Sequence, residues 1–303
     1  MGRSVLLIVN HTKPRAIDAA GEVRELIKQH GTLVAELRSA ELTEHGVDRY
    51  QDHAIDLVVV LGGDGTILSA GRACIDLDVP LLGINTGKVG FMAGYELESF
   101  RNQAADVLGS APLHTHAHRT LECVVTGDDG TERLRSHALN EFVVTAGPPY
   151  RMITLDIGIN GQPGPTVSGD GLIVCTPTGS TAYNISAGGP IVAPGVDAMA
   201  ITPIAAHSLS FRPIVLNADT AIDIDVRSVN ATEASGTTLL VDGHGHYRIY
   251  QGDRVSIQGG SRSVRFVADP TVTYWRTLIG KMHWASAPTG HIGNDCPTSD
   301  PTR

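Results

Sequence analysis

Short runs of consecutive apolar residues in the first third of the chain restrict its fold more than any other feature. Such runs occupy residues 4–10 (SVLLIVN), 56–62 (DLVVVLG) and 79–85 (VPLLGIN). A strand with apolar side chains at successive positions is buried on both faces, and the stretches between these runs, such as 17–31, carry apolar residues at helical spacing. Alternation of the two predicts a parallel sheet covered by helices, an α/β domain over residues 1–115.

The pattern changes near residues 112–120 to strands of two-residue alternation. A GDDG turn at 127–130 predicts an antiparallel hairpin, and further alternating pieces run to about residue 268. The only helix expected here is at 182–188. These patterns predict a β-rich, sandwich-like domain over 116–269. Residues 270–285 predict an amphipathic segment with Trp275, Leu278, Ile279 and Met282 at its apolar positions. The tail, 286–303, lacks periodicity and is expected to be disordered.

Composition excludes several classes of function. The net charge is −9 and no basic block occurs, so the sequence predicts no nucleic-acid or acidic-membrane partner. No apolar run approaches the roughly 18 residues that span a bilayer, and residues 1–10 do not resemble a signal peptide, which predicts a cytoplasmic protein. The four cysteines are widely spaced, which argues against both a disulfide framework and a zinc site.

The sequence GGDGT at 62–66 places a carboxylate where a strand changes to a helix. Gly62 and Gly63 can adopt unusual backbone angles and expose N–H groups to an anion, and Thr66 is placed to cap a helix beginning near Ile67. Asp64 would repel a phosphate unless a metal ion intervenes or the carboxylate takes a proton from a hydroxyl, and both uses belong to phosphoryl transfer. A solvated turn residue is the alternative.

Two further segments suggest a ligand with sugar and phosphate oxygens. Residues 168–190 predict a strand followed by a loop rich in hydroxyls, in which Tyr183 can stack on a base. Asn140 and Glu141 are adjacent polar residues in an apolar strand and suggest a ribose or amide contact. The alternative for 168–190 is a purely structural turn, and the alternative for Asn140 and Glu141 is a strand entrance exposed to solvent.

The remaining histidines and serines carry weaker signals. His114, His116 and His118 alternate along a predicted strand, and His244 and His246 do the same, but no carboxylate or cysteine at ligand spacing supports a metal site. We therefore assign no metal-binding residues. No Gly-x-Ser-x-Gly element is present, which excludes a serine hydrolase with a nucleophile elbow.

Taken in order, these motifs resemble the NAD kinase family over residues 4–284. The resemblance rests on GGDGT (62–66), NTGKVGF (85–91), NE (140–141), DGLIVCTPTGSTAY (170–183), HSLSFRP (207–213) and VDG (241–243). It implies an α/β domain, a β-rich domain and a C-terminal segment that returns to the first. It also implies transfer of a phosphate from ATP or polyphosphate to the 2′-hydroxyl of the adenosine ribose of NAD, with Mg²⁺ or another divalent cation, and self-association as a dimer or tetramer.

The resemblance implies roles for particular residues. Asp64 would be the general base, and Gly62, Gly63, Gly65 and Thr66 would shape the phosphate end. Glu141 would hold ribose hydroxyls. The other residues expected to bind NAD are Gly65, Phe91, Asn140, Arg151, Asp170, Thr181, Ala182, Tyr183, Asn184, Ser186, Ala205 and His244.

Two departures and two alternatives accompany the resemblance. Many relatives have arginine where this chain has Ser168, and this difference leaves open whether the protein accepts NADH. Many also have glutamine where this chain has His244, so the ligand contact at that position is expected to differ.

The alternative enzyme is a lipid or sugar kinase that shares the glycine motif, although this does not explain TPTGSTAY or NE. The alternative without catalysis is a dinucleotide-sensing module, which the intact Asp64 and its glycines disfavour.

Overall fold

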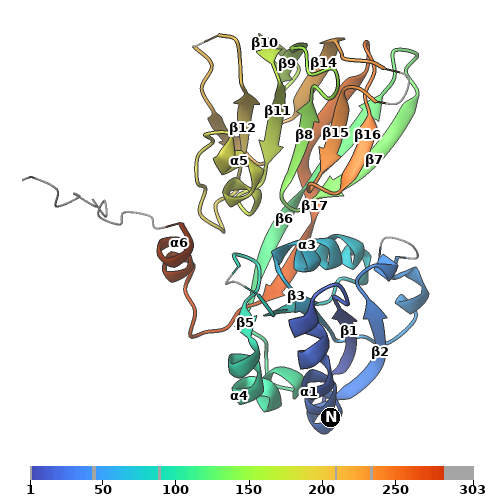
Figure 1. Cartoon of the computed structure of the whole chain (residues 1–303), viewed down its shortest axis with the longest axis vertical. Coiled ribbons are helices and arrows are strands. Elements are labelled where there is room, and N and C mark those ends of the chain that lie inside the picture. The colour runs from blue at the N-terminus through green and yellow to red at the C-terminus, as the bar shows by residue number, and fades with distance from the viewer. Residues whose placement is uncertain (1, 43–45, 88–89, 209, 233–234, 283–303) are drawn as a thin grey trace, which may run out of the picture.

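The structure is a computed structural model that describes residues 2–42, 46–87, 90–208, 210–232 and 235–282 (Figure 1). Its helices are α1 (Pro14–His30), α3 (Asp64–Ala73), α4 (Leu97–Leu108), α5 (Tyr183–Ser186) and α6 (Tyr274–Met282). Its strands are β1 (Ser4–Val9), β2 (Thr32–Arg38), β3 (Leu57–Gly62), β4 (Leu81–Asn85), β5 (Tyr95–Glu96), β6 (Thr115–Thr126), β7 (Glu132–Ala138), β8 (Glu141–Thr145), β9 (Ile153–Ile159), β10 (Gln162–Gly169), β11 (Gly171–Cys175), β12 (Ala198–Ile204), β13 (Ile214–Asn217), β14 (Ile222–Ser228), β15 (Thr238–Val241), β16 (Gly245–Arg248) and β17 (Arg254–Val267).

The first domain has the predicted α/β architecture. Strands β2, β1, β3 and β4 lie side by side in that order, and each pair is parallel. Successive residues of β3 are buried on opposite faces: Val59 packs with α1 and α4, while Val58 and Val60 pack with α3. The continuous apolar runs therefore arise because helices cover both faces of this sheet.

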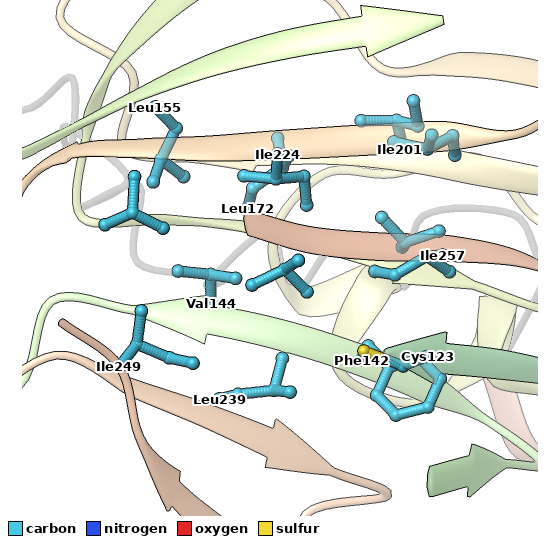
Figure 2. Packing of buried hydrophobic residues seen from close by; sticks show 14 of the residues in the cluster. Cys123, Phe142, Val144, Leu155, Leu172, Ile201, Ile224, Leu239, Ile249 and Ile257 are labelled. Atoms are coloured by element: carbon cyan, nitrogen blue, oxygen red, sulfur yellow. The ribbon is translucent and has the colours of Figure 1, made fainter. Parts of the chain in front are cut away.

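The second domain is a sandwich of antiparallel strands, as predicted. One layer has the order β13-β12-β11-β8-β15-β16, and the other contains β10, β9, β14 and β17 with β6 and β7. Figure 2 shows the core between the layers, where Phe142 and Leu172 from the first meet Ile224 and Ile257 from the second. Cys123 is also in this core, and burial raises the pKa of its thiol to about 12. Cys74 and Cys175 are buried free thiols too, and Cys296 lies outside the described residues.

Two long strands connect the domains. β6 and β17 pair antiparallel along their lengths and run from the sandwich down to the α/β domain (Figure 1). At its lower end β17 pairs parallel with β4, where Phe266 is opposite Leu81. The two domains thus share one continuous sheet, and the boundary near residue 115 falls where β6 begins.

The C-terminal segment returns to the first domain, as the resemblance implies. The Gln103 amide on α4 donates to Asp269, and α6 follows. The predicted apolar face of this helix is only partly buried: Leu278 is 2% exposed, but Trp275 is 55% and Ile279 49% exposed. The expected helix at 182–188 is shorter than predicted and consists of α5 alone. The tail expected to be disordered, 286–303, lies outside the described residues.

Candidate functional site

Asp64 is the first residue of α3 and directly follows β3 and Gly63. The helix begins three residues earlier than predicted, with Gly63 rather than Thr66 at the N-cap position. The Thr66 hydroxyl instead accepts a hydrogen bond from the Asn10 side-chain amide at 2.7 Å. The capping role predicted for Thr66 is therefore wrong, because the helix has already begun at Asp64 and Thr66 lies inside its first turn.

The two glycines before Asp64 do not adopt the unusual backbone angles that were predicted. Neither has a positive φ, and Gly63 is extended with φ of −100° and ψ of −178°. A Cβ at Gly62 would lie 2.6 Å from the Cβ of Thr66, whereas one at Gly63 would meet nothing within 4 Å. Glycine is needed at 62 for space between strand and helix, not for backbone conformation.

The Asp64 carboxylate is held by the loop that follows β4. The backbone N–H of Phe91 donates to Oδ2 at 2.9 Å, and that of Met92 donates to Oδ1 at 3.3 Å. Gly90 packs so closely that any side chain there would overlap the carboxylate. These contacts fix the orientation of Asp64, which is more than a solvated turn residue requires.

Lys281 reaches the same carboxylate from α6. Its Nζ lies 3.2 Å from Asp64 Oδ2 and 4.5 Å from the centre of the Phe91 ring. Both charged side chains are about one-third exposed, at 37% for Lys281 and 31% for Asp64, so the pair contributes at most about 1 kcal/mol to stability. Its significance is chemical, because it places a cation beside the candidate base.

Asn140 and Glu141 are buried at the start of β8, which contradicts the alternative of a solvated strand entrance. Asn140 is 9% and Glu141 4% exposed. The Asp242 carboxylate accepts the backbone N–H groups of Leu139, Asn140 and Glu141 at 2.7–3.1 Å. The side-chain oxygens Asn140 Oδ1 and Glu141 Oε2 are buried without a partner. Because buried polar atoms are normally paired, these two are suited to meet a polar ligand.

Glu141 and Asp242 form a buried carboxyl pair with unequal environments. Burial, and secondarily the charge of Asp242, raises the pKa of Glu141 to about 8. Burial also raises the pKa of Asp242, but its three N–H donors and the Arg72 guanidinium act in the opposite direction. Glu141 therefore holds the proton near neutral pH and presents a neutral carboxyl to a ligand.

Stability should depend on pH through Glu141. Its folded pKa lies above the unfolded value, so between about pH 5 and 8 the native state holds a proton that the unfolded state lacks. The free energy of unfolding should therefore fall as pH rises, by up to about 1.4 kcal/mol per unit from this group. Glu141→Gln should match the wild type at pH 5 and exceed it at pH 8.5 in urea unfolding. Exposed Glu132→Gln is the control, and parallel curves for wild type and Glu141→Gln would contradict the assignment.

The hydroxyl-rich loop after β11 lies beside this pair. The Thr176 hydroxyl donates to the Leu139 carbonyl at 2.6 Å, and the Thr176 N–H donates to the Asn140 carbonyl at 2.8 Å. The loop then forms a 3-10 turn, Gly179–Thr181, and α5. Thr181 and Ala182 are half-buried, and the Tyr183 ring is 42% exposed beside exposed Ser186. These side chains remain predicted ligand contacts.

Asn184 differs from its neighbours in this loop. It is fully buried, its amide group donates to the carbonyls of Ser180 and Pro190, and its Oδ1 accepts the Thr202 hydroxyl at 2.6 Å. The structure uses its side chain to hold the loop against β12. The Asn184 side chain therefore has no free polar group for the predicted contact with NAD.

His244 approaches the glycine motif from the sandwich domain. It follows the tight turn of the β15–β16 hairpin, in which Asp242 and Gly243 have φ of 51° and 70°. Its Cε1 lies 4.0 Å from where a Cβ of Gly65 would be. His244 Nδ1 is 2.7 Å from the Asp242 carbonyl, and a carbonyl can only accept, so Nδ1 carries a proton and donates it in this hydrogen bond.

Three predicted residues lie away from this group. In the six-stranded sheet Glu141 pairs with Cys175 at one end, and Thr145 pairs with Gly171 at the other. Asp170 and Ala205 are near the Thr145 end, since Asp170 donates its N–H to the Ile204 carbonyl and Ala205 follows β12. Arg151 is there too, because the Asn230 amide donates to both the Ala146 and the Arg151 carbonyls. Four residues of strand separate the ends, roughly 13 Å. The structure therefore does not bring these three together with Asp64.

Several site residues were missed by sequence reasoning. Lys281 and Arg72 have no local signal, because their partners are far along the chain. Gly90 and Asp242 lay within quoted motifs, NTGKVGF and VDG, but were assigned no role. Lys88 and Val89 of the first motif lie outside the described residues.

The described ranges contain neither a cluster of metal ligands nor a membrane-spanning helix. No three His, Cys, Asp or Glu side chains in these ranges gather closely enough to hold a metal ion. His118 instead bonds to the Thr178 hydroxyl at 2.7 Å, and burial lowers the pKa of His118 to about 4. None of the helices in these ranges has the length and apolar content needed to cross a membrane.

Comparison with known proteins gives consistent matches over most of the chain. Residues 5–111 match the family model of the ATP-NAD kinase N-terminal domain, and residues 139–268 that of the C-terminal domain. The NAD kinase of Magnetococcus marinus is 35% identical over 93% of this chain and 94% of its own length. That of Rhodopirellula baltica is also 35% identical, over 87% of this chain and 81% of its own.

Two solved structures share the fold. Yeast NADH kinase in complex with NADH superposes with a TM-score of 0.77, at 23% identity, over 94% of this chain and 88% of that one. An NAD kinase from Archaeoglobus fulgidus in complex with ATP gives a TM-score of 0.68, at 24% identity, over 93% of this chain and 98% of that one. With both family domains matched in order and relatives at 35% identity over most of its length, the chain belongs to the NAD kinase family.

Proposed function

We propose that this protein transfers the terminal phosphate of ATP, or of another phosphoryl donor, to the 2′-hydroxyl of the adenosine ribose of NAD to give NADP. The observation that carries the proposal is an oriented carboxylate, Asp64, on the same helix as Arg72, whose partner Asp242 binds the backbone of Asn140 and Glu141. These two residues carry the buried, unpartnered oxygens. A phosphoryl transferase needs a base for the acceptor hydroxyl, and a ribose needs polar partners in a dry site. The names of the relatives agree with this activity.

Asp64 has the environment of a general base. Two backbone N–H groups aim its carboxylate, and it is partly accessible, so a ribose hydroxyl can approach it. Lys281, 3.2 Å away, is placed to contact an incoming phosphate oxygen once the hydroxyl engages Asp64. Neutral Glu141 can donate its carboxyl proton to one ribose oxygen, and Asn140 Oδ1 can accept from another.

The residues near Asp64 fit a divalent cation that enters with the donor. Mg²⁺ in such sites keeps several waters and is held largely by the substrate phosphates, so it would need few protein ligands while Asp64 serves as the base. When bound, Mg²⁺ neutralises charge on the donor phosphates. Lys281 beside the same carboxylate would add to that neutralisation.

Self-association would account for the three predicted residues at the far end of the sheet. Arg151, Asp170 and Ala205 are separated from Asp64, so we propose that they complete the site of a neighbouring copy. Exposed apolar residues nearby support an interface, since Tyr150 is 75% and Met152 54% exposed. Sedimentation should then show a dimer or tetramer, and a monomer at the assay concentration would contradict the proposed self-association.

A cytoplasmic location stays part of the proposal.

One assay tests the proposed reaction against its alternatives. Purified protein is incubated with Mg²⁺ and NAD or NADH, and with ATP, another triphosphate or polyphosphate, and NADP or NADPH is measured. Phosphorylation of NAD is the expected result. Absence of product with every donor would overturn the proposal. Phosphorylation of a diacylglycerol or a sugar phosphate instead would favour a lipid or sugar kinase, and NAD binding without turnover would favour a sensing module.

A further inference from the structure

One face of α3 rests on the β15–β16 hairpin of the other domain. Gly65 and Arg72 are seven residues apart, two helical turns, and therefore lie on the same face. Gly65 is close to the His244 ring. At the other end, Arg72 Nη1 donates to the Val241 carbonyl at 3.2 Å and lies 3.7 Å from Asp242 Oδ2. The helix that begins with Asp64 thus lies close to the sandwich domain near its start and is hydrogen-bonded to it near its end.

Asp242 extends this attachment to the Asn140–Glu141 pair. Its side chain is 1% exposed, and its carboxylate binds three consecutive N–H groups, those of Leu139, Asn140 and Glu141. Leu139 also packs against α3, since a Cβ at Gly71 would lie 2.8 Å from its Cδ1. Contacts therefore run from Arg72 through Asp242 to the backbone of the two residues that carry the unpartnered oxygens.

We propose that Arg72 is a positioning residue, which acts through Asp242 to fix the Asn140–Glu141 pair relative to Asp64. The inference rests on the proposed function, in which these groups meet the same ribose. Arg72 itself is 30% exposed and hydrogen bonds to protein atoms, so it need not touch substrate. One nitrogen at the end of its guanidinium, Nη1, makes both contacts, the hydrogen bond to Val241 O and the ion pair with Asp242 Oδ2. A lysine ammonium lies on a shorter side chain and reaches this position less well.

The fold does not depend on Arg72 alone to join the domains. β6 and β17 run through both and pair along their whole length. Loss of the guanidinium is therefore expected to leave a folded protein in which the relation of Asp64 to the ribose site is looser. Misplacement by about 1 Å is enough to reduce turnover by roughly 10²-fold.

The test compares Arg72→Met and Arg72→Lys with Arg101→Met, which removes an exposed ion pair with Glu22 in the same domain. For Arg72→Met we expect kcat about 10- to 100-fold below wild type, with the Kd for NAD within about threefold. The kcat of Arg72→Lys should fall between those of Arg72→Met and wild type, and the kcat of Arg101→Met should match wild type. Added guanidinium ion should partly restore the kcat of Arg72→Ala. A kcat within twofold for Arg72→Met, or a loss confined to NAD affinity, would overturn the proposal.

Amide hydrogen exchange gives a readout that does not need turnover. The N–H groups of Leu139, Asn140 and Glu141 bond to Asp242, so they should exchange faster in Arg72→Met than in wild type, while exchange in β3 stays the same. Unchanged exchange at these three amides would refute the route through Asp242, whatever the activity. Failure of the proposed function is distinct, because it would appear as a wild type that makes no NADP.

Discussion

Asp64→Asn is expected to lower kcat by roughly 10²- to 10⁴-fold, the usual contribution of a general base. Asparagine has nearly the same shape, and its oxygen can still accept from the Phe91 N–H, so the loop that holds residue 64 should stay in place. What is lost is the ability to take the proton from the ribose hydroxyl. The measurement is single-turnover formation of NADP, with the Kd for NAD determined separately by calorimetry.

A matched variant controls for the change of charge. Asp78→Asn also converts an acid to its amide in the first domain, at an 88% exposed side chain with a left-handed φ of 48° that asparagine tolerates. It should retain wild-type kcat. If Asp64→Asn binds NAD normally but stays within tenfold of wild type in kcat, Asp64 is not the base, and its contact with Lys281 must serve another purpose.

The layers of the fold were predictable because each leaves a local pattern. In β3 every position is apolar, since α1 and α4 cover one face and α3 the other, and the sequence shows this directly. In β9 and β14 buried residues alternate with partly exposed ones, as one-sided burial requires. The continuous sheet through β6 and β17 was not predictable, because pairing of Phe266 with Leu81 leaves no mark in either segment.

The amphipathic segment predicted at 270–285 is present as α6, but its burial was not predictable, for a related reason. Spacing identified a helix with an apolar face but not the amount of protein available to cover it. Leu278 is buried, whereas Trp275 and Ile279 are about half exposed. Periodicity indicates which side chains share a face, and only the tertiary structure determines whether that face is covered.

The candidate site was predictable where its chemistry is concentrated in a few neighbouring residues. Asp64 stood out as a charge in an anion-binding turn, and Asn140 and Glu141 as polar residues in an apolar strand. The groups that orient them were not predictable, because the contacts of Lys281, Arg72 and Asp242 join residues more than 100 positions apart along the chain. A single sequence contains the reacting groups, but their supports arise from contacts between distant segments.

Gly90→Ala should reduce kcat about 10²-fold without unfolding the protein. A methyl group at this position would overlap the Asp64 carboxylate, which is the end of a partly exposed side chain and can rotate away. That rotation breaks the hydrogen bonds from the Phe91 and Met92 N–H groups and moves the carboxylate away from the position where it takes the proton. Circular dichroism, the melting temperature and NADP formation measure the separate effects.

Two comparisons separate this effect from a general cost of adding a methyl group. Gly21→Ala, on α1 where a Cβ would meet nothing within 4 Å, should keep wild-type kcat and be slightly more stable, because alanine favours the helix. In the Asp64→Asn background, Gly90→Ala should cause little further loss, since both changes disable the same group and such effects do not add. An additional loss of about 10²-fold in the double variant would show that Gly90 acts on the reaction independently of Asp64, and the close contact between them would then not be the reason for a glycine at this position.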